Sequence, residues 1–77
     1  MNPAHIRRDI LALTYQQRES DPDRGWVNRA DLIAAIGACD FALSVLTEIG
    51  HLKKDGYHYR ITGAGVLAYE AMRDPAP

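Results

Sequence analysis

Residues 28–50 constrain the fold more tightly than any other part of the chain, because two short apolar-periodic segments flank one glycine there. Leu32 and Ile36 have helical spacing, and Asn28 ahead of them is a residue type that caps helix N-termini. Gly37 follows, where a helix can end in a left-handed conformation without steric cost. The sequence therefore predicts two helices joined by a tight turn.

The second helix of this pair has an unusual composition. We expect Asp40 to cap it, its body to run from residue 41 to about residue 50, and Gly50 to close it. Its apolar arc is wide, since six of the nine residues from 41 to 49 are apolar, whereas packing on a core needs only one face. The net charge of the chain is −1, and residues 31–52 are its acidic third, with three acidic groups and no Lys or Arg.

A longer helix precedes this pair. Asn2 is a capping residue type, Pro3 suits a first helical position, and apolar residues repeat at helical spacing up to Leu13, so we expect a helix from about residue 3 to about residue 18. A turn-rich loop follows at 19–25, and the apolar pair at 26–27 is long enough for a strand of two or three residues.

A hairpin and a final helix follow the pair. Asp55-Gly56 is a tight-turn signal between residues 52–54 and 57–61, and the third, short strand can cover an open edge of this hairpin. We place Tyr57 and Tyr59 on its packed face, with base stacking as the alternative. Thr62 is positioned to cap the last helix. We interpret residues 63–65, Gly-Ala-Gly, as its first turn, close to another backbone.

The chain of 77 residues is one domain, 1–77, with an expected ordered core from about 3 to 73. Its hydrophobic content of 47% and charged content of 25% indicate a globular protein. The single Cys39 excludes an internal disulfide and fits a reducing compartment. We expect no signal peptide and no membrane span, and therefore a cytoplasmic protein.

These segments together resemble a winged helix-turn-helix domain, from about Ile6 to about Met72. The segment RADLIAAIGACDFALSVLTEI matches the helix-turn-helix pattern. The segment IGHLKKDGYHYRIT resembles the helix end and wing hairpin of many bacterial transcription regulators, and ITGAGVLAYE resembles the start of the helix that follows the wing. The resemblance implies an α+β, mainly α fold: a three-helix core, a small antiparallel β-wing and a C-terminal helix.

The resemblance also implies how the domain would bind double-stranded DNA. The third helix would enter the major groove, and the wing would lie along the backbone or minor groove. Carried over by position, the base-facing candidates on the third helix are Asp40, Phe41, Ser44, Thr47 and Glu48. The candidates on the wing and for phosphate contact are Arg29, Lys53, Lys54, His58 and Arg60.

The third helix departs from this pattern, because it offers none of the Arg, Lys, Asn or Gln side chains that usually read base edges. Ser44 and Thr47 can hydrogen-bond a base or phosphate. Asp40 and Glu48 repel phosphate, except that Glu48 can accept a hydrogen bond from a cytosine amine. Affinity would therefore come mainly from the basic side chains, with strong salt dependence, and dimerisation would double the number of phosphate contacts.

A rival function is a protein-interaction or dimerisation module that has the same fold and does not bind DNA. Its candidate interface is Phe41 and Val45, since an exposed aromatic beside an apolar residue is typical of such surfaces. The alternative is that Phe41 folds back over the turn near Cys39 and the first helix.

Catalysis and metal binding have no support in the sequence. His5, His51, His58 and Cys39 lack zinc-like spacing, and we interpret Cys39 as a small apolar filler at the turn. No nucleophile and base, and no pair of carboxylates, suggests an active site. We therefore expect a protein that is not an enzyme and has no cofactor or metal.

Overall fold

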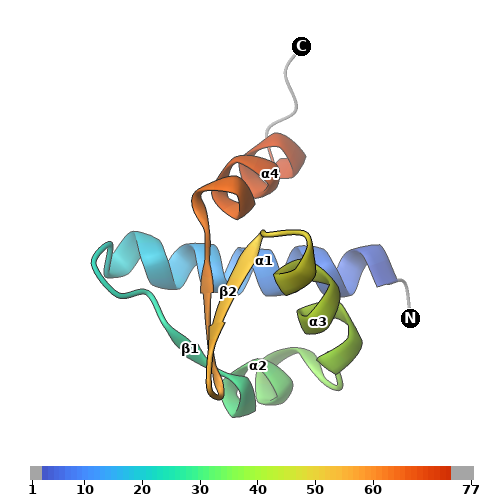
Figure 1. Cartoon of the computed structure of the whole chain (residues 1–77). Coiled ribbons are helices and arrows are strands. Elements are labelled where there is room, and N and C mark those ends of the chain that lie inside the picture. Colours follow the sequence, from blue (N-terminus) through green and yellow to red (C-terminus); the bar gives the residue numbers. More distant parts are fainter. Residues whose placement is uncertain (1–2, 74–77) are drawn as a thin grey trace.

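The computed structural model describes residues 3–73 and is a mainly helical α+β fold with a small antiparallel sheet (Figure 1). This confirms the predicted class and order of elements. The elements are α1 (Pro3–Ser20), β1 (Val27–Asn28), α2 (Arg29–Ile36), α3 (Asp40–Glu48), β2 (Leu52–Asp55), β3 (His58–Ile61) and α4 (Gly63–Arg73). The predicted cap at Asn2 lies outside the described residues.

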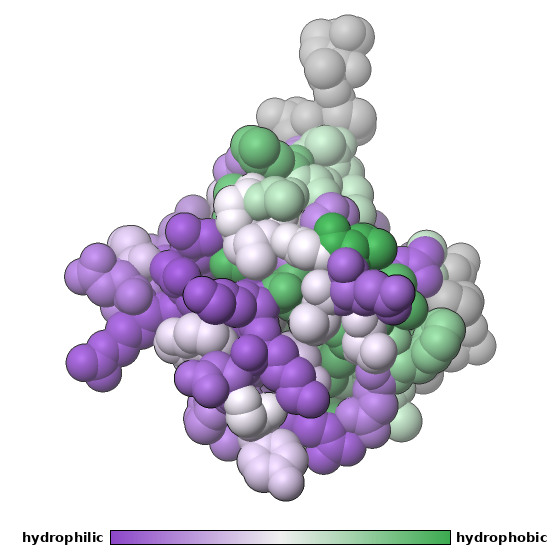
Figure 2. Space-filling view, viewed as in Figure 1, coloured by the Kyte–Doolittle hydropathy of each residue, from purple (hydrophilic) through white to green (hydrophobic). Residues whose placement is uncertain are grey.

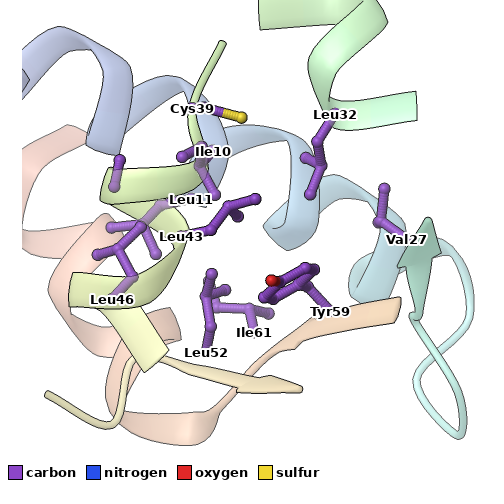
Figure 3. Packing of buried hydrophobic residues seen from close by; sticks show 11 residues of the cluster. Ile10, Leu11, Val27, Leu32, Cys39, Leu43, Leu46, Leu52, Tyr59 and Ile61 are labelled. Carbon is purple, nitrogen blue, oxygen red and sulfur yellow. The ribbon is translucent and has the colours of Figure 1, made fainter. Parts of the chain in front are cut away.

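The long helix α1 is the centre of the molecule, because α2, α3, α4 and β3 all pack against it. Its residues Ile10, Leu11 and Thr14 are fully buried. The Thr14 hydroxyl donates to the carbonyl of Ile10 at 2.8 Å, so this buried polar group is satisfied within its own helix. Figure 3 shows the apolar side chains of α2, α3 and the sheet gathered around α1.

The α2–α3 pair confirms the predicted helices and turn, with one correction. Asn28 caps α2 by accepting a hydrogen bond from the Ala30 N–H at 2.8 Å, and Gly37 ends α2 with φ = 103°. The prediction that Asp40 caps α3 is wrong. Cys39 holds the cap position without a side-chain cap hydrogen bond, and Asp40 is already helical. The physical reason is that the Asp40 carboxylate binds the guanidinium of Arg29 instead.

The end of α3 is closed by a pair of backbone hydrogen bonds across Gly50, which has φ = 88°. The Gly50 N–H donates to the Thr47 carbonyl, and the His51 N–H donates to the Leu46 carbonyl. This is the Schellman arrangement, in which a glycine in a left-handed conformation lets the chain reverse. It directs the chain into β2.

The sheet has the strand order β1-β3-β2, so the predicted short third strand covers one edge of the hairpin. It comprises Val27 and Asn28, one residue later than predicted. Asp55 pairs with His58, which leaves Gly56 and Tyr57 as the two turn residues. Gly56 has φ = 62° and no non-glycine residue in the described part of the chain has a positive φ, which fits a type II′ turn.

The prediction that both Tyr57 and Tyr59 face the core is therefore half wrong. Tyr59 is buried, as expected from alternation with its neighbours in β3. Tyr57 is 73% exposed, because it lies in the turn, where the two-residue alternation of a strand no longer applies.

The start of α4 confirms both predictions made for it. The Thr62 hydroxyl accepts a hydrogen bond from the Gly65 N–H at 3.1 Å and donates to the Gly50 carbonyl at 2.5 Å. Gly65 is buried, and a Cβ atom there would collide with the backbone carbonyl of His51. The glycine therefore permits α4 to begin directly against the end of α3.

In the described part of the chain, residues 3–73, no helix combines the length and apolar character that a membrane span requires.

Candidate functional site

A groove of about 470 Å³ lies between α3 and the β2–β3 hairpin and brings together side chains from four elements. It is the surface on which most of the predicted site residues meet. Its lining residues are Arg29, Asp40, Ser44, Thr47, Glu48, Lys54, Tyr57 and Tyr59.

The contribution of α3 follows from helical spacing. Asp40, Ser44, Thr47 and Glu48 are separated by four, three and one residues, so they share one face of the helix. Its core side is buried through Ala42, Leu43 and Leu46, which fixes the rotation of α3 relative to the hairpin. The apolar positions of this helix thereby decide which polar side chains reach the groove.

The contribution of the hairpin follows from strand register. Lys54 pairs with Tyr59, and both side chains belong to the groove side of the sheet. The Lys54 ammonium lies 5.9 Å from the centre of the Tyr59 ring, within cation–π range. Lys53 pairs with Arg60 at the next position, and because side chains alternate, these two cations belong to the opposite face.

The strongest polar contact of the groove joins Arg29, the first residue of α2, to Asp40, the first residue of α3. The guanidinium donates from Nε at 2.7 Å and from Nη2 at 2.8 Å to the two carboxylate oxygens. These hydrogen bonds lower the pKa of Asp40 against an opposing effect of desolvation, and they raise the pKa of Arg29. Both groups are therefore charged at neutral pH, and the predicted phosphate ligand has an internal anionic partner.

The remaining α3 side chains in the groove differ in what they offer a ligand. Ser44 is exposed and its hydroxyl makes no hydrogen bond within residues 3–73, so this hydroxyl can donate to a ligand or accept from one. The Thr47 hydroxyl donates to the Leu43 carbonyl at 2.7 Å, which leaves it as an acceptor. Glu48 is exposed and adds a negative charge.

Four of the ten residues predicted to contact DNA lie outside the groove. Arg60 donates from Nη2 to the Pro22 carbonyl at 3.1 Å, so its guanidinium is turned toward the loop before β1, and its Nε is buried without a hydrogen-bond partner in the described part of the chain. His58 lines a separate hollow with Trp26, and Lys53 is exposed on the same sheet face.

Phe41 is the fourth residue outside the groove, and the structure decides between the two alternatives left open for it. Its side chain is 81% exposed rather than folded into the core. It borders a small hollow of about 140 Å³ on the flank of α3, together with Cys39 and residues of α1. Val45, the other candidate interface residue, is partly buried.

Tyr57 lines the groove, although the sequence analysis placed it on the packed face of the hairpin and gave base stacking as the alternative. It lies at the hairpin tip, where an exposed aromatic ring can stack on a planar ligand. The sequence signal for its exposure was its position directly after Asp55-Gly56. A turn formed by Gly56 and Tyr57, instead of Asp55 and Gly56, places Tyr57 at the tip.

The groove gathers charges of both signs, two cations and two carboxylates, and has no positive strip running along it. Within residues 3–73, no group of His, Cys, Asp and Glu is arranged to hold a metal ion. Cys39 is buried, as predicted for a small filler, and burial raises the pKa of its thiol. Comparison with protein-family models, with curated proteins and with solved structures found no match for this chain.

Proposed function

We propose that this chain is a winged helix-turn-helix module that binds double-stranded DNA through the groove side of α3 and the β2–β3 hairpin. The observation that carries the proposal is the meeting of Arg29, Ser44 and Lys54 on one open surface beside an exposed helix face. These residues come from α2, α3 and β2, and six of the ten predicted site residues line the same groove.

The dimensions of α3 suit the proposed role. A helix with its side chains is about 10–12 Å across, and the major groove of B-DNA is about 12 Å wide. In the proposed complex, the face of α3 with Ser44 and Thr47 approaches the base edges, and the hairpin that carries Lys54 and Tyr57 follows the sugar–phosphate backbone. The small number of base-reading side chains favours contacts that depend little on sequence.

The charges of the groove set the expected strength of binding. Arg29 reaches a phosphate only if that phosphate shares or displaces the Asp40 carboxylate. Lys54 forms no salt bridge in the described residues and acts on Asp40 through its charge alone. With two to four phosphate contacts in a monomer, the slope of log K against log salt is about −2 to −4. Binding is therefore expected to be weak at physiological salt and clear at low salt.

The adjacent lysines provide a matched test of the proposal, because they are neighbours in sequence and lie on opposite faces of the sheet. Lys54→Ala is expected to weaken binding to a mixed-sequence duplex about fivefold and to reduce the salt slope by about 0.9. Lys53→Ala removes the same charge from the far face and is expected to change affinity less than twofold. Fluorescence anisotropy titration of labelled duplex at several salt concentrations measures both quantities.

The proposal is wrong if the wild-type chain shows no binding at the lowest salt concentration. Equal effects of the two lysine substitutions would leave DNA binding in place and remove the groove as its site.

A second candidate function, a protein-interaction module without DNA binding, is favoured by one specific observation. The groove contains as many carboxylates as cations, whereas an exposed phenyl ring lies on the flank of the same helix. A chain that does not bind duplex DNA at low salt and self-associates, or binds a protein, through Phe41 would have this function.

A further inference from the structure

Both cations of the groove act on one anion, the carboxylate of Asp40. The Arg29 guanidinium binds its two oxygens, from Nε at 2.7 Å and from Nη2 at 2.8 Å. These hydrogen bonds are the main cause of the lowered pKa of Asp40, and the charge of Lys54 lowers this pKa further. Lys54 therefore lies within electrostatic reach of the same carboxylate. Cations from α2 and β2 thus act on a single anion position.

This arrangement has the chemistry of a phosphate site. A guanidinium binds a carboxylate and a phosphate in the same way, by two parallel hydrogen bonds to two oxygens, and a lysine beside it adds a point charge. Arg29 and Asp40 are also the first residues of α2 and α3, so the positive ends of two helix dipoles lie next to the pair. The Asp40 carboxylate occupies the place that a phosphate group would take.

The pair is accessible to a competing anion. The side chains of Arg29 and Asp40 are 40% and 62% exposed, and both line the open groove of about 470 Å³. Figure 2 shows purple, hydrophilic residues gathered over the hairpin that forms one side of this groove. An exposed ion pair is weak, because water and salt screen it. A phosphate can therefore replace the carboxylate without opening the core, and the displaced Asp40 side chain turns to solvent.

From these contacts we infer that Arg29 and Lys54 form a phosphate-binding site that Asp40 occupies in the ligand-free chain. Asp40 is then an internal competitor, which a phosphate group has to displace before it reaches Arg29. The identification of this group as a phosphate of the DNA backbone rests on the proposed function. The anion site itself does not, since a free phosphate has the same chemistry.

The groove contains a matched control for the removal of Asp40. Glu48 is its second carboxylate and forms no salt bridge within residues 3–73. Asp40→Ala frees Arg29 and is expected to raise the affinity for a mixed-sequence duplex about tenfold. It is also expected to steepen the salt slope by about 0.9, because one more phosphate is contacted. Glu48→Ala removes the same charge without freeing a cation, so affinity is expected to rise no more than about threefold, with an unchanged slope. Fluorescence anisotropy measures both quantities, and circular dichroism checks folding.

Inorganic phosphate tests the site without DNA. In nitrogen-15 NMR spectra at constant ionic strength, phosphate is expected to shift the Arg29 Nε–H signal of the Asp40→Ala variant in a saturable way. The same signal in the wild-type chain and in Glu48→Ala is expected to shift much less, because Asp40 still holds the guanidinium. A variant that binds phosphate at Arg29, when neither it nor the wild type binds duplex DNA, would support the site and overturn the proposed function.

The phosphate site is wrong if the Arg29 signal of Asp40→Ala does not respond to inorganic phosphate. Equal changes of duplex affinity and salt slope in Asp40→Ala and Glu48→Ala would overturn its assignment to the DNA backbone, since loss of charge alone would explain them. Phosphate binding at Arg29 in that case would assign the site to a free phosphate group.

Discussion

Two glycines at the start of α4 have opposite surroundings, although only one residue separates them. The space where a Cβ would project from Gly65 is already occupied by the His51 carbonyl and the Ile61 side chain. The same space beside Gly63 is empty to a distance of 4 Å. Neither has a positive φ, so the difference is one of contact and not of backbone conformation.

The two alanine substitutions are therefore expected to have opposite signs. Gly65→Ala forces the start of α4 away from the end of α3 and is expected to destabilise the fold by about 1–3 kcal/mol. Gly63→Ala meets no obstacle, restricts the unfolded chain and favours the helix, so it is expected to stabilise by about 0.5–1 kcal/mol. Urea unfolding followed by circular dichroism measures both, and equal effects would show that α4 is not packed as described.

At the scale of elements, the Arg29–Asp40 pair joins the first residue of α2 to the first residue of α3. It spans the turn that the two helices share, and it costs α3 the side-chain cap that the sequence predicted. Because the pKa of Asp40 is lowered in the folded state, the stability that this pair contributes is complete above the ordinary pKa of 3.8. The contribution is lost as the pH falls through the lowered pKa.

The pair can be tested by following the Asp40 carboxyl carbon by NMR during an acid titration. In the wild-type chain the midpoint is expected below the ordinary Asp value, because hydrogen bonds from Arg29 favour the carboxylate. In the Arg29→Gln variant the midpoint for Asp40 is expected to rise. The free energy of unfolding at pH values above the ordinary Asp pKa is expected to fall. A midpoint that does not respond to this substitution would mean that the ion pair is not formed in solution.

At the scale of the whole molecule, one apolar cluster joins residues from α1, α2, α3 and the sheet (Figure 3). A domain of 77 residues has a stability on the order of 4–12 kcal/mol in total. Truncation of a single core side chain therefore removes a large fraction of the total stability. The helices and the sheet are expected to unfold together.

Leu43 is the sharpest probe of this cluster, since it is fully buried on the core side of α3. Leu43→Ala is expected to destabilise by about 2–5 kcal/mol and to lower the melting temperature. The same substitution at the exposed Leu67 is expected to change the free energy of unfolding by no more than about 0.5 kcal/mol. Thermal unfolding monitored by far-ultraviolet circular dichroism checks both. A similar loss at the two positions would indicate that Leu67 is covered in solution, for example by another copy.

The order and type of the elements could be predicted from the sequence, because the determining interactions are local. Asn28 caps the helix that follows it by binding an N–H two residues away. Gly37 and Gly50 mark the ends of α2 and α3, and apolar spacing marks the buried faces. The sequence also predicted a close approach of residues 63–65 to another backbone, and the structure shows it at Gly65 and not at Gly63.

The site was only partly predictable, because it depends on contacts between residues distant in the chain. The sequence identified Lys53 and Lys54 as one basic pair, and the strand register assigned them to opposite faces. It identified Arg29 as a phosphate ligand and Asp40 as a cap, and the arrangement of the first residues of α2 and α3 brought the two together.

The sequence by itself thus determined which segments become helices and strands and where each one ends. Only the tertiary structure decided which side chains share a surface. Capping, turn formation and periodicity act over a few residues and can be recognised along the chain. The exposure of Phe41 and Tyr57, and the contents of the groove, follow from the rotation of α3 on the core and the register of the hairpin. Both are set when elements far apart in sequence pack together.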